Sequence, residues 1–265
     1  MKWWIYIIIF LVGQLAGGIA GGVLSNILHV EPTFAIAVAL ALANVLSICL
    51  ALLFKPAWLS ASADKNRMTW LALFMALPVI VLVNLLLEIL PELPNIIDDT
   101  LFNQITDNPL GVLTIVVLGP VAEELLFRAG VLGGLLKRDA ERRATDGHSH
   151  PWLAVIWSAL FFSIAHMNPA QIPVAFILGI LLGWAYWRTG SLVAPCLIHM
   201  LNNGLAVGLS LAYDSPDVKL SQVLGGEVGV ALAFGVSVLW LGVCLHKASQ
   251  AEYSQSSSSD VEEIQ

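Results

Sequence analysis

Long runs of apolar residues, separated by short polar stretches, follow one another through most of this chain. A helix that crosses a lipid bilayer needs about 20 predominantly apolar residues. The pattern predicts eight such helices, over residues 3–24, 32–54, 69–90, 110–136, 151–167, 171–188, 191–211 and 226–246. The fifth and sixth runs are short and only Asn168, Pro169 and Ala170 separate them, so we expect a tight hairpin there.

Composition supports the same class. The 265 residues are 58% hydrophobic and 12% charged, whereas a soluble domain carries about 25% charged residues. Lysine and arginine also fall on alternate loops, at Lys2, Lys55, Lys65, Arg67, Lys137, Arg138, Arg142, Arg143, Arg188 and Lys247. The opposite loops hold Glu31, Glu92, Asp98, Asp99, Asp107, Asp214 and Asp217 against Lys219. Because basic loops stay in the cytoplasm, we expect an all-α polytopic membrane protein with both termini cytoplasmic.

The same pattern suggests how the chain is organised. Residues 1–107 hold three spans and an outer loop, 108–211 hold four spans, and 212–247 hold the last one. Residues 248–265 are rich in serine and acidic residues, which is typical of a disordered tail. No basic stripe suggests nucleic acid. The lipid bilayer is therefore the expected surrounding, in the plasma membrane of a prokaryote or in an organellar membrane.

Three charged residues lie inside the fourth predicted span, at Glu123, Glu124 and Arg128. Each charge at bilayer depth costs roughly 2.5–3.5 kcal/mol on insertion scales, so such residues usually serve a function. Residues four apart share a helix face, so Glu124 can pair with Arg128. Glu123 points elsewhere and is left to face a cavity as a general base. The alternative is that all three form an inert buried network.

Two further spans supply polar side chains. The fifth ends in Phe162-Ser-Ile-Ala-His166, and the seventh contains His199-Met-Leu-Asn-Asn203, with His199 and Asn203 on one face. Taken alone, His166 is typical of a hydrogen-bonded helix end, and His199 with Asn203 is typical of contacts between membrane helices. Together with Glu123 they make up a base, a proton shuttle and oxyanion donors, the parts of a hydrolytic site.

The ordered motifs Glu123-Glu124-Leu-Leu-Phe-Arg128, Phe162-Ser-Ile-Ala-His166 and His199-Met-Leu-Asn-Asn203 resemble those of the CPBP intramembrane proteases. That family includes the type II CAAX prenyl endopeptidases and bacterial proteins linked to bacteriocin processing and self-immunity. The resemblance covers about residues 108–210. It implies a peptide or lipidated protein substrate, either a CAAX-prenylated tail or a leader peptide.

The resemblance also implies a role for each matched residue. Glu123, with His166, would activate a water for attack on the scissile carbonyl, and His199 and Asn203 would hold the oxyanion. Glu124, Arg128 and Phe162 would support the site structurally. The sequence raises one difficulty of depth, because Glu123 lies 13 residues, or roughly 20 Å, after Leu110, whereas His166 lies near the outer end of its span. The hairpin must dip into the membrane, or the fourth span must start deeper.

Metal dependence is open at this point. His166, His199 and a glutamate can supply a His₂Glu zinc set, although no HExxH motif is present. Asn203 suits an oxyanion donor better than a zinc ligand, so we expect no cofactor and a glutamic-type protease. Two other functions fit the same residues. One is a non-catalytic scaffold or immunity protein of the same fold, and the other is a proton-coupled transporter.

Overall fold

The computed structural model describes residues 2–56, 65–89, 93–96, 99–215 and 218–262. Glu92, Asp98 and Asp217 lie outside these ranges. The regular elements in the described ranges are helices: α1 Ile5–Asn26, α2 Pro32–Leu53, α3 Lys65–Ile89, α4 Asp99–Thr106, α5 Pro109–Leu113, η1 Thr114–Leu118, α6 Gly119–Glu124, η2 Leu125–Leu132, α7 Gly133–Asp146, α8 Pro151–Ala165, α9 Ile172–Thr189, α10 Val193–Tyr213, α11 Leu220–Val223 and α12 Glu227–Glu262.

The predicted spans all correspond to helical segments. In the described part of the chain, seven helical segments are long and apolar enough to cross a bilayer, the fourth being the continuous run from α5 to α7 over Pro109–Asp146. The eighth, α8, is apolar but only 15 residues long. The chain is therefore an all-α, multi-pass integral membrane protein.

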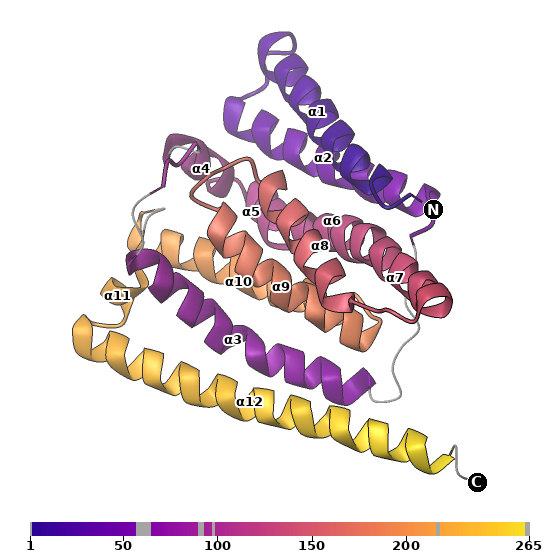
Figure 1. Cartoon of the computed structure of the whole chain (residues 1–265). Coiled ribbons are helices and arrows are strands. Elements are labelled where there is room, and N and C mark those ends of the chain that lie inside the picture. Colours follow the sequence, from indigo (N-terminus) through magenta and orange to yellow (C-terminus); the bar gives the residue numbers. More distant parts are fainter. Residues whose placement is uncertain (1, 57–64, 90–92, 97–98, 216–217, 263–265) are drawn as a thin grey trace.

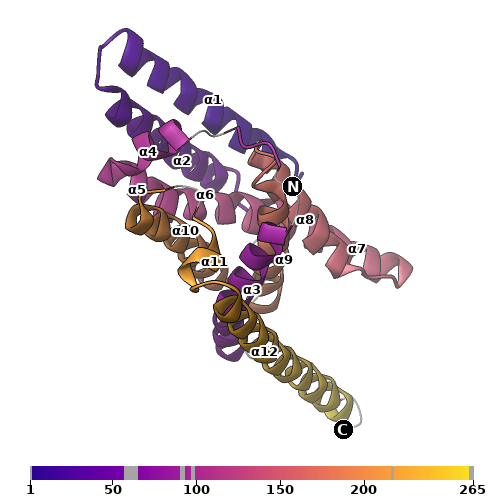
Figure 2. The same ribbon diagram turned by 90° about the vertical axis from the view of Figure 1, so that its left-hand side faces the viewer.

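The helices form a layered bundle (Figure 1). The α1–α2 hairpin covers one side and α12 lies along α3 on the other, with α6, η2, α8, α9 and α10 between them. A view turned by 90° shows the same order, with the hairpin and α12 at opposite ends of the bundle (Figure 2). The start of α1, the α7–α8 connection and the end of α12 all lie at one end of the bundle. The predicted basic loops belong to this end.

Small residues bring α1 close to α2. A Cβ added to Gly17 would lie 2.6 Å from the Cβ of Ala43, and one added to Gly13 would lie 2.0 Å from Ser47 Oγ. Contacts that short do not occur between real side chains, so the hairpin depends on glycine at both positions. Close helix approach through small residues is common in membranes, where van der Waals packing drives helix association.

One difference from the sequence prediction concerns the C-terminal tail. The helix α12 runs to Glu262, although the composition of residues 248–265 predicts disorder. The apolar window of this helix ends at Ala248, but no glycine or proline follows Gly242 to interrupt the helix. The backbone continues as a helix through residues 249–262, which include six serines, without a residue that would break it.

Candidate active site

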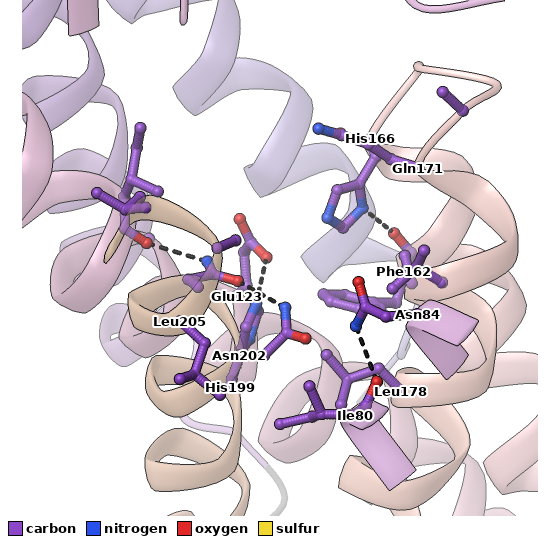
Figure 3. Close-up of a pocket in the computed structure, with 18 of the residues that line it drawn as sticks. Ile80, Asn84, Glu123, Phe162, His166, Gln171, Leu178, His199, Asn202 and Leu205 are labelled. Carbon is purple, nitrogen blue, oxygen red and sulfur yellow. Dashed lines mark hydrogen bonds and ion pairs between the residues drawn. The ribbon is translucent and has the colours of Figure 1, made fainter. Parts of the chain in front are cut away.

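A cavity of about 820 Å³ opens inside the bundle, bounded by α1, α2, α3, α6, α8, α9 and α10. Its walls are mostly apolar and carry a small set of polar side chains: Gln14, Asn44, Asn84, Asn95, Thr114, Glu123, His166, Gln171, His199, Asn202 and Asn203. The predicted catalytic residues Glu123, His166, His199 and Asn203 all line it. Figure 3 shows Glu123, His199 and Asn202 on one wall, with His166, Phe162 and Gln171 on another.

The two adjacent glutamates have different surroundings. Glu123 lines the cavity with 23% of its side chain exposed, whereas Glu124 is fully buried. Both sit in the last turn of α6, where neighbouring side chains point about 100° apart on an α-helix. The expected division, with Glu124 paired and Glu123 facing the cavity, is therefore present in the geometry.

Glu124 contacts two partners. Its Oε2 lies 3.0 Å from Nε of Arg128, and its Oε1 lies 2.8 Å from Nδ1 of His199. Arg128 is fully buried too; its guanidinium carbon lies 4.3 Å from the centre of the Phe162 ring, and Nη2 donates to the Gly179 carbonyl at 3.4 Å. The sequence predicted the Glu124–Arg128 pair, but it did not predict that Glu124 also holds His199.

These contacts define how each imidazole is protonated. A carboxylate that pairs with arginine can only accept, so Nδ1 of His199 donates to Glu124 and the ring presents Nε2 to the cavity. That Nε2 lies 3.8 Å from Oε2 of Glu123. His166 is arranged in the same way, since its Nδ1 lies 2.9 Å from the Phe162 carbonyl. Both histidines therefore turn Nε2 towards the cavity, from different walls.

The fourth span contains two π-helical segments, η1 and η2, on either side of the two glutamates. In η1 the N–H of Gly119 bonds to the carbonyl of Thr114, five residues back. The equivalent partner of the Ile115 carbonyl would be residue 120, which is proline and has no N–H. Asn203 donates to that carbonyl at 3.0 Å. Pro120 thus creates the acceptor that fixes Asn203 beside Glu123.

The side-chain amide of Asn203 keeps one N–H donor for a further hydrogen bond. An asparagine amide has two N–H donors, and one hydrogen bond to Ile115 leaves Asn203 a second. Asn202 donates to Oδ1 of Asn203 at 3.1 Å, which orients the pair. Two amides therefore line the same cavity as Glu123 and His199 and can donate to a developing negative charge.

The position of His166 resolves the question of depth. Counted from the basic end, Glu123 lies 14 residues before Lys137 and His166 lies 15 residues after Pro151, so at about 1.5 Å per residue both are roughly 21–23 Å deep. The short α8 brings its C-terminal end inside the bundle. The following hairpin is held there by Asn168, which donates to Asn95 at 2.8 Å and accepts from the N–H of Ile96 at 3.2 Å.

The residues of the possible zinc set, His166, His199 and Glu123, line the same cavity. Among the described residues, no group of three or more histidine, cysteine, aspartate or glutamate side chains is placed to hold a metal ion. Each histidine has Nδ1 hydrogen-bonded, to Glu124 in His199 and to the Phe162 carbonyl in His166, and this leaves Nε2 towards the cavity, an arrangement that is also usual for metal-ligating histidines. Metal dependence therefore stays a prediction.

Several lining residues were not anticipated from the sequence. Asn44 and Asn84 each donate to the backbone carbonyl four residues earlier, Leu40 and Ile80, and so keep their side-chain oxygens as acceptors. Asn202 adjoins the third motif. The available signal was an amide side chain inside an apolar run, as in Asn44 and Asn84, but such a signal does not tell which helices surround one cavity.

Comparisons with known proteins agree with the motifs. Residues 106–205 match the family model described as Type II CAAX prenyl endopeptidase Rce1-like. The chain is 33% identical over 99 residues to the membrane-embedded CAAX protease MroQ of Staphylococcus aureus, which covers 37% of this chain and 38% of that protein. It is 32% identical over 99 residues to an uncharacterized 24.3 kDa protein of Escherichia coli, covering 36% and 42%.

A more distant relative is YdiL of Bacillus subtilis, a candidate membrane peptidase, with 21% identity over 123 residues covering 44% of this chain and 46% of that protein. The matches thus span less than half the length of these relatives, and no solved structure matches. The matched segment holds all three motifs and the cavity wall they form. This segment, residues 106–205, is therefore similar to the Rce1-like type II CAAX prenyl endopeptidases.

Proposed function

We propose that this protein is an intramembrane endopeptidase that hydrolyses a peptide bond of a membrane-associated substrate with a water activated by Glu123. The observation that carries the proposal is the environment of Glu123. Its carboxylate lines the cavity within the bundle, and Oε2 is buried without a hydrogen-bond partner in the described structure. A buried carboxylate oxygen without a partner has its strongest acceptor site free for a water or a substrate group.

The reaction follows from the placement of these groups. A water next to Glu123 loses a proton to the carboxylate as its oxygen bonds to the scissile carbonyl carbon. Nε2 of His166, which faces the cavity, accepts a hydrogen bond from the remaining O–H of that water and orients the attack; this hydrogen stays on the attacking oxygen. The carbonyl oxygen becomes an oxyanion and accepts from the second N–H of Asn203. The proton on Glu123 then passes to the amide nitrogen as the C–N bond breaks, which releases an acid and an amine.

His199 would support the oxyanion through Nε2 when that nitrogen carries a proton, while its Nδ1 donates to Glu124. Its Nδ1 lies 2.8 Å from Oε1 of Glu124 and its Nε2 lies 3.8 Å from Oε2 of Glu123. Removing one oxyanion donor typically lowers the rate by about 10²–10³, so the neighbouring amides and this imidazole would supply a large share of the catalysis.

The cavity also bears on the class of substrate. Its walls combine apolar side chains with the acceptor oxygens of Asn44 and Asn84. An extended peptide has backbone N–H groups that need acceptors once they leave water. We infer that these amides receive the backbone of a peptide segment that enters the bundle. A CAAX-prenylated tail and a leader peptide both meet this requirement.

The test is cleavage of a panel of quenched-fluorescent peptides, with and without a prenyl group, by purified protein in detergent or in nanodiscs. Glu123→Gln should abolish cleavage. Glu88→Gln is the matched control, because Glu88 also lies in a membrane helix but accepts from the N–H of Ser221 and is not one of the residues that line the cavity. Cleavage by Glu123→Gln at the parent rate would refute the role of Glu123, and inhibition by a zinc chelator would refute the metal-free mechanism.

A further inference from the structure

A second cavity, of about 370 Å³, lies at the basic end of the bundle, away from the residues of the candidate active site. It is formed where the residues that precede α1 meet the first two turns of α7. Its walls carry three cationic side chains, two tryptophans and one carboxylate: Lys2, Lys137, Arg138, Trp3, Trp4 and Glu141. The proposed proteolysis uses none of these groups.

The cavity sits at the expected boundary between membrane and water. Trp3 and Trp4 come directly before Ile5, where the first membrane helix begins, and Lys137 follows Leu136, where the apolar run of the fourth span ends. Tryptophan is enriched at this depth because its amphipathic ring suits the headgroup region. The surrounding loops are the basic ones, so this end faces the leaflet surface on the cytoplasmic side of the predicted topology.

Packing, and not only charge, holds the walls of this cavity. A Cβ on Gly134 would lie 2.8 Å from the Cβ of Trp3, so glycine is required for α7 to approach this close. The Trp3 ring stacks on Phe161 of α8, with centroids 5.3 Å apart. Nζ of Lys2 lies 5.5 Å from the centre of the Trp4 ring. Three separate segments of the chain therefore converge to form one built concavity with cationic walls.

We propose that this cavity binds the phosphodiester headgroup of an anionic phospholipid, of the phosphatidylglycerol type, from the adjoining leaflet. Three cationic side chains can contact one phosphate, and basic pockets of this kind between membrane helices bind acidic headgroups. The volume equals about twelve waters at ~30 Å³ each, which suits a phosphoglycerol group. The Glu141 carboxylate accepts from a glycerol hydroxyl, and the tryptophans contact the upper acyl chains.

The experiment measures lipid binding by delipidated protein with native mass spectrometry, as phosphatidylglycerol is titrated against phosphatidylcholine. Each basic residue near a membrane surface contributes about fivefold in affinity for acidic lipid. Lys137→Gln and Arg138→Gln should therefore each weaken phosphatidylglycerol binding about fivefold, and together about 25-fold. Arg142→Gln with Arg143→Gln is the matched control, since both are exposed on α7 outside the cavity, and should leave binding within twofold.

Two further arms identify the source of the phosphate and guard against unfolding. Soluble glycerol-3-phosphate should not compete at concentrations equal to the lipid; competition by it would show a site for a free phosphate ester and overturn the proposal. Equal binding of phosphatidylcholine, or equal loss in the Arg142/Arg143 control, would overturn it as well. Lys137→Arg keeps the charge and should restore binding, which separates loss of recognition from loss of folding.

Discussion

The most informative single substitution is Glu124→Gln. It removes one negative charge but keeps the shape of the side chain and an oxygen that can accept from His199. Glu124 and Arg128 are both fully buried and 3.0 Å apart. The variant therefore leaves the Arg128 charge without its carboxylate in a site where solvent cannot compensate.

The size of the effect follows from that burial. Breaking a buried ion pair by removing one partner costs about 3–5 kcal/mol, because the remaining charge is uncompensated. At about 2–4 °C per kcal/mol for chains of this size, the apparent melting temperature should fall by about 10 °C. Glu123→Gln is the comparison, since Glu123 is 23% exposed to the cavity and its Oε2 accepts no hydrogen bond, its contact with Nε2 of His199 being 3.8 Å long. This variant should unfold within about 2 °C of the parent.

Tryptophan fluorescence during heating, in one detergent and at one protein concentration, measures both variants. Melting within about 2 °C of each other for Glu124→Gln and Glu123→Gln would refute the assignment of Glu124 as the buried partner of Arg128. A third variant, Glu124→Gln with Arg128→Met, tests whether the uncompensated Arg128 charge causes the loss of stability. Removing both charges should recover most of the lost stability, because replacing a buried pair by uncharged groups of similar size is often close to neutral.

Three further predictions address other parts of the molecule. Asn203→Ala should lower kcat about 10²–10³-fold, the effect of losing one oxyanion donor. It should also lower the stability of the protein by about 1–3 kcal/mol, because the Ile115 carbonyl loses its hydrogen-bond donor. An unchanged kcat in single-turnover cleavage would contradict the donor role. Asn84→Leu should raise KM about fivefold and leave kcat unchanged, because the substrate loses one hydrogen bond of ~1 kcal/mol to the Asn84 side chain. A fall in kcat alone would contradict a role of Asn84 in substrate positioning. Hydrogen bonds from the Thr33 hydroxyl and N–H and from the Phe34 N–H hold the pKa of Glu31 below its usual value. The carboxylate therefore caps α2 fully at a pH above the usual pKa, and this stabilisation is lost as the pH falls through the lowered pKa. The stability of the parent should drop towards that of Glu31→Gln in acid, and parallel pH profiles of stability for the two proteins would contradict this role of Glu31.

Much of the fold could be predicted because membrane insertion imposes a simple rule. Each span must supply about 20 apolar residues, and the eight predicted runs each became a helical segment, although α8 is shorter than a full span. The α-helical pairing of Glu124 with Arg128 was predictable for the same reason, since spacing alone places them together. The C-terminal tail differed from the prediction of disorder. Its polar composition led to that prediction, but the tail contains no glycine or proline that would end the helix α12.

The contacts between spans could not be predicted from spacing. Nothing in the sequence indicates that His199 meets Glu124, 75 residues away, or that Asn203 meets the Ile115 carbonyl, 88 residues away. Pro120 was the one local sign, because a proline inside a helix leaves a carbonyl without its N–H partner. The sequence does not say which neighbouring side chain occupies that carbonyl, since this depends on how the helices pack.

The pairing of two adjacent glutamates has a physical explanation in this arrangement. A single carboxylate beside Arg128 would be engaged in an ion pair with it and would not be available as a base. Because Glu124 occupies Arg128 and the Nδ1 proton of His199, Glu123 keeps its charge for the cavity, and Nε2 of His199 is turned towards it. Arg128 in turn is positioned by the Phe162 ring, which lies between it and His166. Burying charges in a membrane costs free energy. Here the buried charged residues are connected in one chain of contacts that ends at the proposed catalytic carboxylate.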